Sequence, residues 1–239
     1  MSKILVKEKD IVVPGECLAQ GMDYLPGNGT YREGEKIIAS RLGLTVVDGR
    51  AIKLIALAGK YLPKRGDTII GQIKEILMSG WMIDTNSAYH AMLSMKEATS
   101  EFIPKGADLT HYFNFGDYVV CKITNVTSQK LVDVTARGPG LRKLKDGRVI
   151  TVNTHKVPRI IGKKGSMVSM IKQATGCKII VGQNGIIWLQ GEDIKMEFLA
   201  VNTIKKIERE AHISGLTDRI KEYLEKETGK KITITVSGE

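Results

Sequence analysis

Two glycines that flank two lysines form the most specific chemical signal in the sequence. They make up the run Gly162-Lys163-Lys164-Gly165, which precedes a stretch of helical apolar spacing over residues 166–175. Glycine permits tight backbone geometry and the close approach of another chain. The helix that follows would offer free N–H groups and a positive dipole end, and the lysines add positive charge. The run is therefore predicted to bind the sugar-phosphate backbone of a nucleic acid.

The elements around this run bear on whether it is a binding loop, because a Gly-x-x-Gly pattern alone occurs in many turns. A short helical segment over 157–161 precedes it, and a helix, a hairpin over 178–189 and a long helix from Asp193 to about residue 211 follow. This is the order of a type I KH domain, which holds four nucleotides of a single strand. Arg159, just before the loop, joins the candidate RNA-binding residues, and a structural turn stays the alternative. A P-loop is disfavoured, because Lys164 stands where Ser or Thr would be needed.

The middle of the chain resembles an S1 domain over segments 64–73, 79–84 and 115–123. Such a domain is an OB-type barrel that stacks bases on aromatic side chains. Trp81 falls where these domains place an exposed aromatic, and burial in the barrel core is the alternative. The family often carries a histidine on the next strand, where this chain reads Ala91-Met92-Leu93-Ser94.

Basic residues of the same region are candidates for phosphate contacts. We select five of them: Arg65, Lys122, Arg137, Arg142 and Lys143. The last three belong to the basic run 137–148, for which a solvated linker is the alternative.

Residue types that catalysis or metal binding requires do not gather in the sequence. The carboxylates show no Asp-x-Asp or Glu-x-x-His spacing, and no serine lies in a Gly-x-Ser-x-Gly pattern. The histidines and cysteines are dispersed, and no Cys-x-x-Cys pair occurs: His90, His111, His155, His212, Cys17, Cys121 and Cys177. We therefore expect no catalytic residue, no metal site and no cofactor, and a reducing cytoplasmic environment.

Composition indicates a folded, basic protein. The 239 residues include 36 Lys and Arg against 26 Asp and Glu, for a net charge of +10, and 42% of residues are hydrophobic. This hydrophobic content excludes wholesale disorder, and no stretch approaches the ~20 apolar residues that would span a membrane. The excess charge is spread along the chain. It fits a body that contacts a polyanion at several places, and equally a basic protein without such a partner.

Breaker clusters divide the chain into three predicted domains, mainly β followed by α+β. Residues 1–61 read as a small N-terminal β domain with strands near 11–13, 36–40, 44–47 and 51–57, and a hairpin at Asp48-Gly49. Residues 62–140 read as a barrel of about five strands, less regular over 85–115. Residues 141–239 read as the KH domain, with a further helix over 217–228 and a last strand over 232–236.

An N-terminal β unit, an S1 barrel and a KH domain in this order resemble one family. This family consists of the RNA-binding cap subunits of the archaeal exosome. The chain resembles the ribosomal-RNA-processing-protein-four type of cap subunit rather than the zinc-ribbon type, because the zinc-ribbon type lacks a KH domain. The resemblance covers essentially the whole chain and rests on the S1 segments, the loop 162–165, Val12-Val13-Pro14-Gly15-Glu16 and Gly27-Asn28-Gly29-Thr30-Tyr31.

The resemblance implies a non-catalytic subunit that recruits single-stranded RNA and guides it to a hexameric ring of RNase-PH-like subunits. The ring degrades RNA phosphorolytically from the 3′ end, and S1 domains line a central pore. The N-terminal domains dock on the ring in a trimeric cap, formed with itself or with a related zinc-ribbon cap subunit. A free-standing RNA chaperone or translation-associated S1/KH protein is the alternative. An enzyme that uses S1 and KH as accessories would need a catalytic cluster that the sequence does not show.

Overall fold

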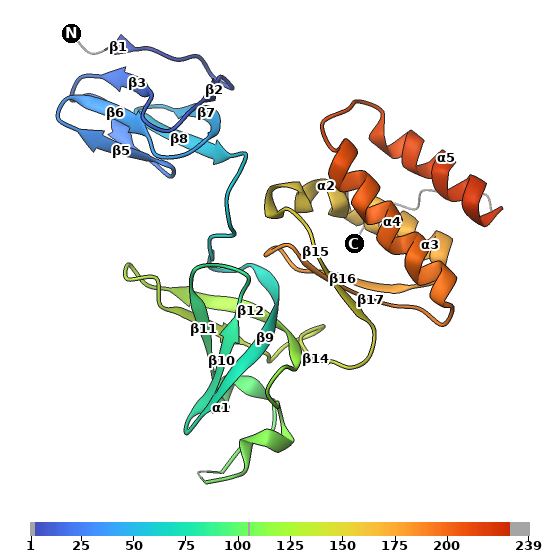
Figure 1. Ribbon diagram of the computed structural model, residues 1–239. Coiled ribbons are helices and arrows are strands. Elements are labelled where there is room, and N and C mark those ends of the chain that lie inside the picture. The colour runs from blue at the N-terminus through green and yellow to red at the C-terminus, as the bar shows by residue number, and fades with distance from the viewer. Residues whose placement is uncertain (1–2, 105, 230–239) are drawn as a thin grey trace. The chain divides into compact units, whose positions relative to one another are not determined.

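Two compact units, Met1–Gly59 and Lys60–Glu239, make up the chain in the computed structural model (Figure 1). The structure describes residues 3–104 and 106–229. The strand predicted over 232–236 lies outside the described residues.

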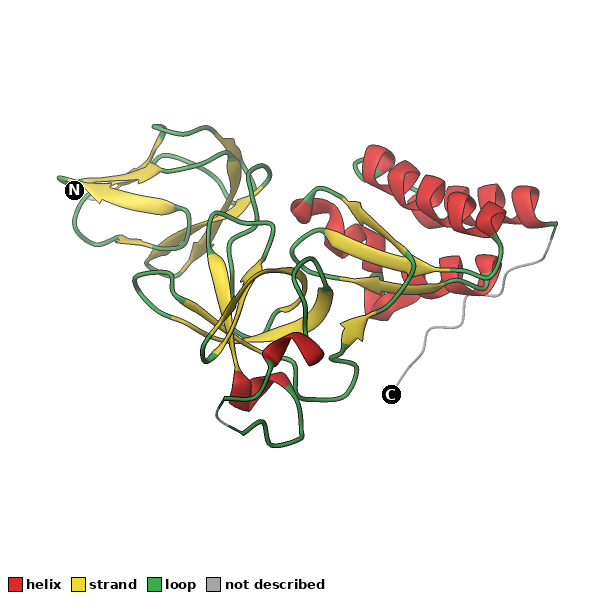
Figure 2. Cartoon of the chain, turned by 60° about the horizontal axis from the view of Figure 1, so that its bottom comes forward, coloured by secondary structure: helices red, strands yellow, loops and turns green. Residues whose placement is uncertain are grey.

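The first unit consists of two four-stranded sheets, in the orders β1-β3-β6-β5 and β2-β7-β8-β4. Figure 2 shows strands and loops, without a helix, over its described residues 3–59. The strands are β1 Lys3–Ile4, β2 Ile11–Val12, β3 Cys17–Gln20, β4 Leu25–Pro26, β5 Thr30–Glu33, β6 Lys36–Ala39, β7 Gly43–Asp48 and β8 Ala51–Ala56. The hairpin predicted at Asp48-Gly49 is confirmed, since Asp48 pairs with Ala51 across a turn in which Gly49 has a φ of 59°.

A six-stranded sheet that closes on itself forms the barrel of the second unit. Its order is β13-β11-β10-β9-β12-β14, and an additional β12–β13 pairing closes it. The strands are β9 Thr68–Leu77, β10 Gly80–Asp84, β11 His90–Ser94, β12 Tyr118–Val126, β13 Val132–Thr135 and β14 Lys143–Leu144. The barrel therefore includes a short strand beyond residue 140, where the sequence placed the domain boundary.

The segment 85–115 is more regular than the sequence predicted. It contains β11, the helix α1 (Met95–Ala98) and a short 3-10 helix (Leu109–His111). In β11 exposed His90 and Met92 alternate with buried Ala91 and Leu93, so its inner face belongs to the barrel core. Met92 is apolar although it is exposed, so the alternation in burial does not appear in the sequence as an alternation of apolar and polar residues.

The KH part of the second unit places helices on one face of a three-stranded antiparallel sheet (Figure 1). The sheet has the order β15-β17-β16. Its elements are β15 Arg148–Thr151, α2 Val157–Ile161, α3 Ser166–Thr175, β16 Lys178–Val181, β17 Ile186–Gln190, α4 Ile194–Glu210 and α5 Leu216–Thr228, with short 3-10 helices at Thr154–Lys156 and Lys163–Gly165. The predicted cap of α4 is confirmed, because the Asp193 side chain accepts a hydrogen bond from the N–H of Lys195.

Both faces of this sheet are covered, which explains why the first four residues of its central strand β17, residues 186–189, are all apolar. In β17 the side chains of Ile187 and Leu189 belong to the core under the helices, and those of Ile186 and Trp188 belong to a second cluster. That second cluster also contains Ile70, Val120 and Leu144 of the barrel. Alternate residues of a strand point to opposite faces, so β17 joins the helices on one side to the barrel on the other.

Polar contacts from the β16–β17 turn complete this junction. The Asn184 side chain is fully buried, and its Nδ2 donates to the main-chain oxygens of Ile70 (2.7 Å) and Thr85 (2.9 Å). Its Oδ1 accepts from the N–H of Ile70 at 3.3 Å. The turn thus supplies hydrogen-bond partners to barrel main-chain groups, and the KH domain and the barrel form one unit.

Candidate nucleic-acid interface

The loop Gly162–Gly165 has a backbone that glycine makes possible at both ends. Gly162 and Gly165 have φ angles of 76° and 79°, and Lys164 between them also lies in the left-handed region at 52°. A Cβ on Gly162 would lie 2.7 Å from both the Cβ and the N of Met167, so a side chain there would collide with the start of α3. A Cβ on Gly165 would meet no atom within 4 Å. The loop therefore packs tightly on one side and is open on the other.

Positive charge at this loop is available to a ligand. The side chains of Arg159, Lys163 and Lys164 are exposed, and within residues 3–104 and 106–229 none of them has a carboxylate within ion-pairing distance. Free cations beside an open main chain are the features that hold phosphate groups. The structure thus brings together the four loop residues and Arg159, as the sequence predicted for a nucleic-acid contact.

Trp81 does not form part of a binding surface, and this prediction was wrong. Its side chain is 0% exposed, in the core of the barrel. Its Nε1 donates to the main-chain oxygen of Phe113 at 2.9 Å, and the two rings meet edge to face at 5.2 Å between centroids. Strand register decides whether a side chain points into the barrel or out to solvent. Trp81 pairs with Leu93 on the neighbouring strand, and both side chains point into the barrel core. A buried ring cannot stack on a base.

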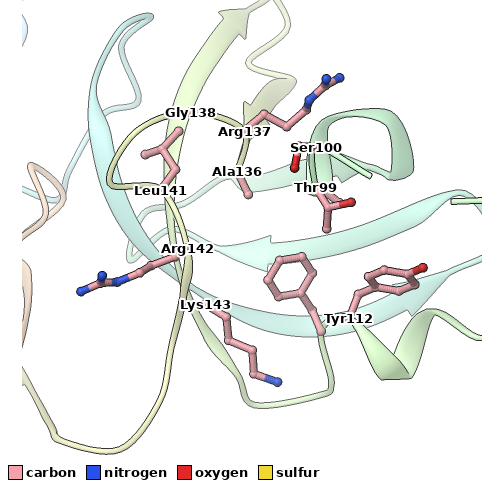
Figure 3. A pocket seen from close by; sticks show the side chains of 11 residues that line it. Thr99, Ser100, Tyr112, Ala136, Arg137, Gly138, Leu141, Arg142 and Lys143 are labelled. Carbon is pink, nitrogen blue, oxygen red and sulfur yellow. The ribbon is translucent and has the colours of Figure 1, made fainter. Parts of the chain in front are cut away.

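Three of the predicted basic residues line one pocket of the barrel, with a volume of about 370 Å³. They are Arg137, Arg142 and Lys143, and Tyr112 and Ser100 also line it (Figure 3). Lys143 forms an ion pair with Asp117, and Arg137 Nη1 donates to the main-chain oxygen of Lys96 at 3.0 Å. In Figure 3 the guanidinium groups of Arg137 and Arg142 point away from each other. The pocket can therefore offer Arg142 and part of Arg137 to an anion, rather than a joint clamp.

The other two basic candidates, Arg65 and Lys122, lie elsewhere on the barrel. Neither lines the pocket that holds Arg137, and both side chains are exposed. Lys122 lies in β12 opposite Thr68, and Arg65 belongs to the turn that leads into β9. The predicted barrel contacts thus spread over the surface instead of converging on one point.

A second pocket was missed by the sequence analysis. It has a volume of about 520 Å³ and lies between the Gly loop and residues 211–218, which are the α4–α5 connection and the first turn of α5. Ser214-Gly215 signals a turn between two helices. No sequence signal places that turn beside the loop 162–165, because the two segments meet only through helix packing.

Neither a metal-binding cluster nor a membrane-spanning helix occurs in the part of the chain that the structure describes. Over the described residues, no group of three or more His, Cys, Asp or Glu side chains lies together as a metal site would require. No helix in that part of the chain is long and apolar enough to cross a membrane.

Three family models match successive parts of the chain. The model described as Exosome complex exonuclease RRP4 N-terminal region matches residues 11–48. The model described as RRP4, S1 domain matches residues 60–104, and a KH domain model matches residues 147–195. The order of the matches is the order of the elements described above.

Curated relatives named exosome complex component Rrp4 are similar over nearly the whole chain. The protein from Methanothermus fervidus is 45% identical, over 92% of this chain and 97% of the relative. The proteins from Methanothermobacter thermautotrophicus and Thermococcus kodakarensis are 43% and 41% identical, over 98% and 94% of this chain and 73% and 88% of the relatives. A crystal structure assigned as an exosome complex RNA-binding protein matches with a TM-score of 0.64 at 36% identity, over 71% of this chain and 97% of that one.

Proposed function

Because the chain belongs to the Rrp4 family of exosome components, we propose that it recruits single-stranded RNA and guides it to a ring of RNase-PH-like subunits for phosphorolytic decay from the 3′ end. The family is one of RNA-binding components with S1 and KH domains, not a catalytic family. On this proposal the chain acts in the cytoplasm within a trimeric cap, formed with copies of itself or with a related zinc-ribbon subunit.

The loop Gly162–Gly165 carries the RNA-binding part of the proposal. Its main chain is open at Gly165, and Arg159, Lys163 and Lys164 are exposed cations without carboxylate partners among the described residues. Phosphate contacts of this kind give affinity without reading sequence. Arg65, Lys122, Arg142 and the pocket around Arg137 would add contacts along the barrel.

An exposed apolar row in the first unit supports docking on a partner through residues 1–61. Ile11 pairs with Leu44, and Leu44 pairs with Ile55, across the neighbouring strands β2, β7 and β8. Ile11 and Ile55 are 67% and 57% exposed. Contiguous apolar side chains on a surface mark interaction sites, and the ring is the partner that the proposal assigns to this face.

Charge reversal at the loop tests RNA binding. Lys163→Glu with Lys164→Glu should lower the affinity for oligouridine roughly tenfold or more, because each charge-assisted contact is worth about 1.5–3 kcal/mol. Lys195→Glu with Lys205→Glu makes the same charge change at exposed positions of α4 and is the control. Fluorescence anisotropy measures both. Equal affinities in the two variants would reject the loop as the RNA contact.

Arginine substitutions in the apolar row test docking. Ile11→Arg with Ile55→Arg should abolish copurification with the ring subunits, because a buried arginine without a partner is strongly unfavourable. Met78→Arg with Leu131→Arg places the same charges on exposed apolar positions of the second unit as a control. Ring subunits that still copurify with the first variant would place the docking surface elsewhere.

A further inference from the structure

The pocket between the Gly loop and the α4–α5 connection has the dimensions of a ligand site. Its volume of about 520 Å³ falls within the range of roughly 300–1,000 Å³ that small-molecule sites occupy. Gly162 and Lys163 belong both to the loop and to the pocket wall. A strand held by the loop therefore borders directly on this pocket.

One part of the pocket wall is apolar. It comes from α2, from the start of α3 and from both sides of the α4–α5 turn: Pro158, Met167, Ile213 and Leu216. Met167 is 4% exposed and belongs to the core, whereas Ile213 is 43% exposed. The flat face of a nucleobase can pack against the buried Met167 side chain and the more exposed Ile213 side chain.

The remaining wall carries groups that bind phosphate and ribose. Arg159 and Lys163 line the pocket, and both lack carboxylate partners in the described part of the chain. Ser166 and Thr217 bring hydroxyl groups, and Asp218 is the one carboxylate among the described lining residues. The arrangement combines phosphate-binding cations with hydrogen-bonding groups for a sugar.

The opposite side of the KH domain is not equally free. The turn between β16 and β17 is held against the barrel, where Asn184 is fully buried and hydrogen-bonded to Ile70 and Thr85. That turn is therefore occupied by its contacts with the barrel. Residues 212–215 of the α4–α5 connection are exposed instead.

We propose that this pocket holds one nucleotide of the RNA strand that the Gly loop grips, with the base on the apolar wall and a phosphate beside Arg159 and Lys163. The proposal rests on the proposed RNA-binding function and adds a site to it. Occupancy by a nucleotide within a chain, rather than by a free mononucleotide, follows from the shared wall residues Gly162 and Lys163.

Methyl and amide NMR on the full chain separates the pocket from the loop. The Met167 and Ile213 methyl signals should shift on titration with a short oligouridine, over the same concentrations that shift the Gly162–Gly165 amides. Ile194 is the control, because it is exposed at the other end of α4, roughly 24 Å along the helix from Glu210. Parallel titrations use uridine 5′-monophosphate and inorganic phosphate, which should give weaker shifts than the oligouridine.

Acidic substitutions on the pocket wall supply the second measurement. Ser214→Glu with Thr217→Glu should weaken oligouridine binding about fivefold or more, which corresponds to the loss of one base contact of about 1 kcal/mol. Both positions are exposed, and acidic residues suit the start of a helix. Gln173→Glu with Asn202→Glu is the matched control at exposed positions of α3 and α4.

The outcomes distinguish the pocket from the RNA-binding function itself. Loop amides that shift while Met167 and Ile213 stay unchanged would overturn the pocket and leave RNA binding intact. Pocket signals that respond to the mononucleotide or phosphate but not to oligouridine would also overturn it. No response of the loop amides to oligouridine would overturn the proposed function and the pocket with it.

Discussion

At the scale of single residues, charge pairing separates the basic side chains of the second unit into two groups. Lys143 pairs with Asp117, and Arg219 lies 3.4 Å from a carboxylate oxygen of Glu210. Lys163 and Lys164 have no such partner among the described residues. A cation that already faces a carboxylate has much of its charge compensated. The loop lysines therefore remain the better groups for an anionic ligand, and sequence alone does not show which cations are paired.

Trp81 has a structural role that one substitution can test. Trp81→Phe removes the hydrogen bond to the main-chain oxygen of Phe113 and leaves that buried oxygen unsatisfied. We expect the free energy of unfolding to fall by about 1–3 kcal/mol. The affinity of the folded protein for oligouridine should not change. Thermal unfolding and anisotropy measure the two quantities. A variant that loses RNA affinity but keeps its stability would show that Trp81 contacts RNA.

At the scale of elements, the β16–β17 turn acts as the polar link between the KH domain and the barrel. Asn184→Asp keeps the size of the side chain but turns an acceptor oxygen toward the carbonyls of Ile70 and Thr85. Each buried group left unpaired costs about 1–3 kcal/mol. We expect the single unfolding transition of the second unit to shift to lower temperature or to split.

Limited proteolysis supplies a local measurement for the same variant. The connection between β13 and β15 should become more easily cleaved once the two domains separate, while cleavage within the first unit stays the same. Asn202→Asp, an exposed position of α4, is the control. An Asn184→Asp protein with the unfolding temperature and the cleavage pattern of the unaltered chain would show that the apolar cluster alone holds the junction.

Sequence reasoning identified elements where local signals were strong. The Gly loop, the Asp193 cap and the Asp48-Gly49 hairpin depend on neighbouring residues, and the structure contains all three. Features that depend on long-range packing escaped it: the direction of Trp81, the burial of Asn184 and the pocket formed with residues 211–218. These follow from strand register and helix packing between distant segments, which a periodicity in one segment does not encode.

At the scale of the whole molecule, two RNA-binding domains on one chain alter how RNA reaches a partner. On the proposed function, binding at the KH loop would raise the local concentration of the same strand at the barrel, because the second contact is intramolecular. The apolar cluster and the Asn184 contacts hold these two domains in one unit. Such a chain should increase RNA delivery to an enzyme without taking part in the chemical step.

A decay assay tests this division of labour. The chain alone should not degrade RNA, with or without phosphate, because the Rrp4 family to which it belongs is one of RNA-binding components with S1 and KH domains. Added to ring subunits with phosphate, the chain should lower the apparent KM more than it changes kcat. Lys163→Glu with Lys164→Glu should lose most of that gain while still copurifying with the ring.

Three results would contradict this view, and each bears on a different part of it. RNA decay by the chain alone, abolished when one acidic residue is replaced, would make it a nuclease. An unchanged KM on addition to the ring would remove the guiding role but not RNA binding. A gain in kcat at constant KM would instead indicate that the chain alters the ring itself, since delivery of substrate acts on kcat/KM and not on turnover at saturation.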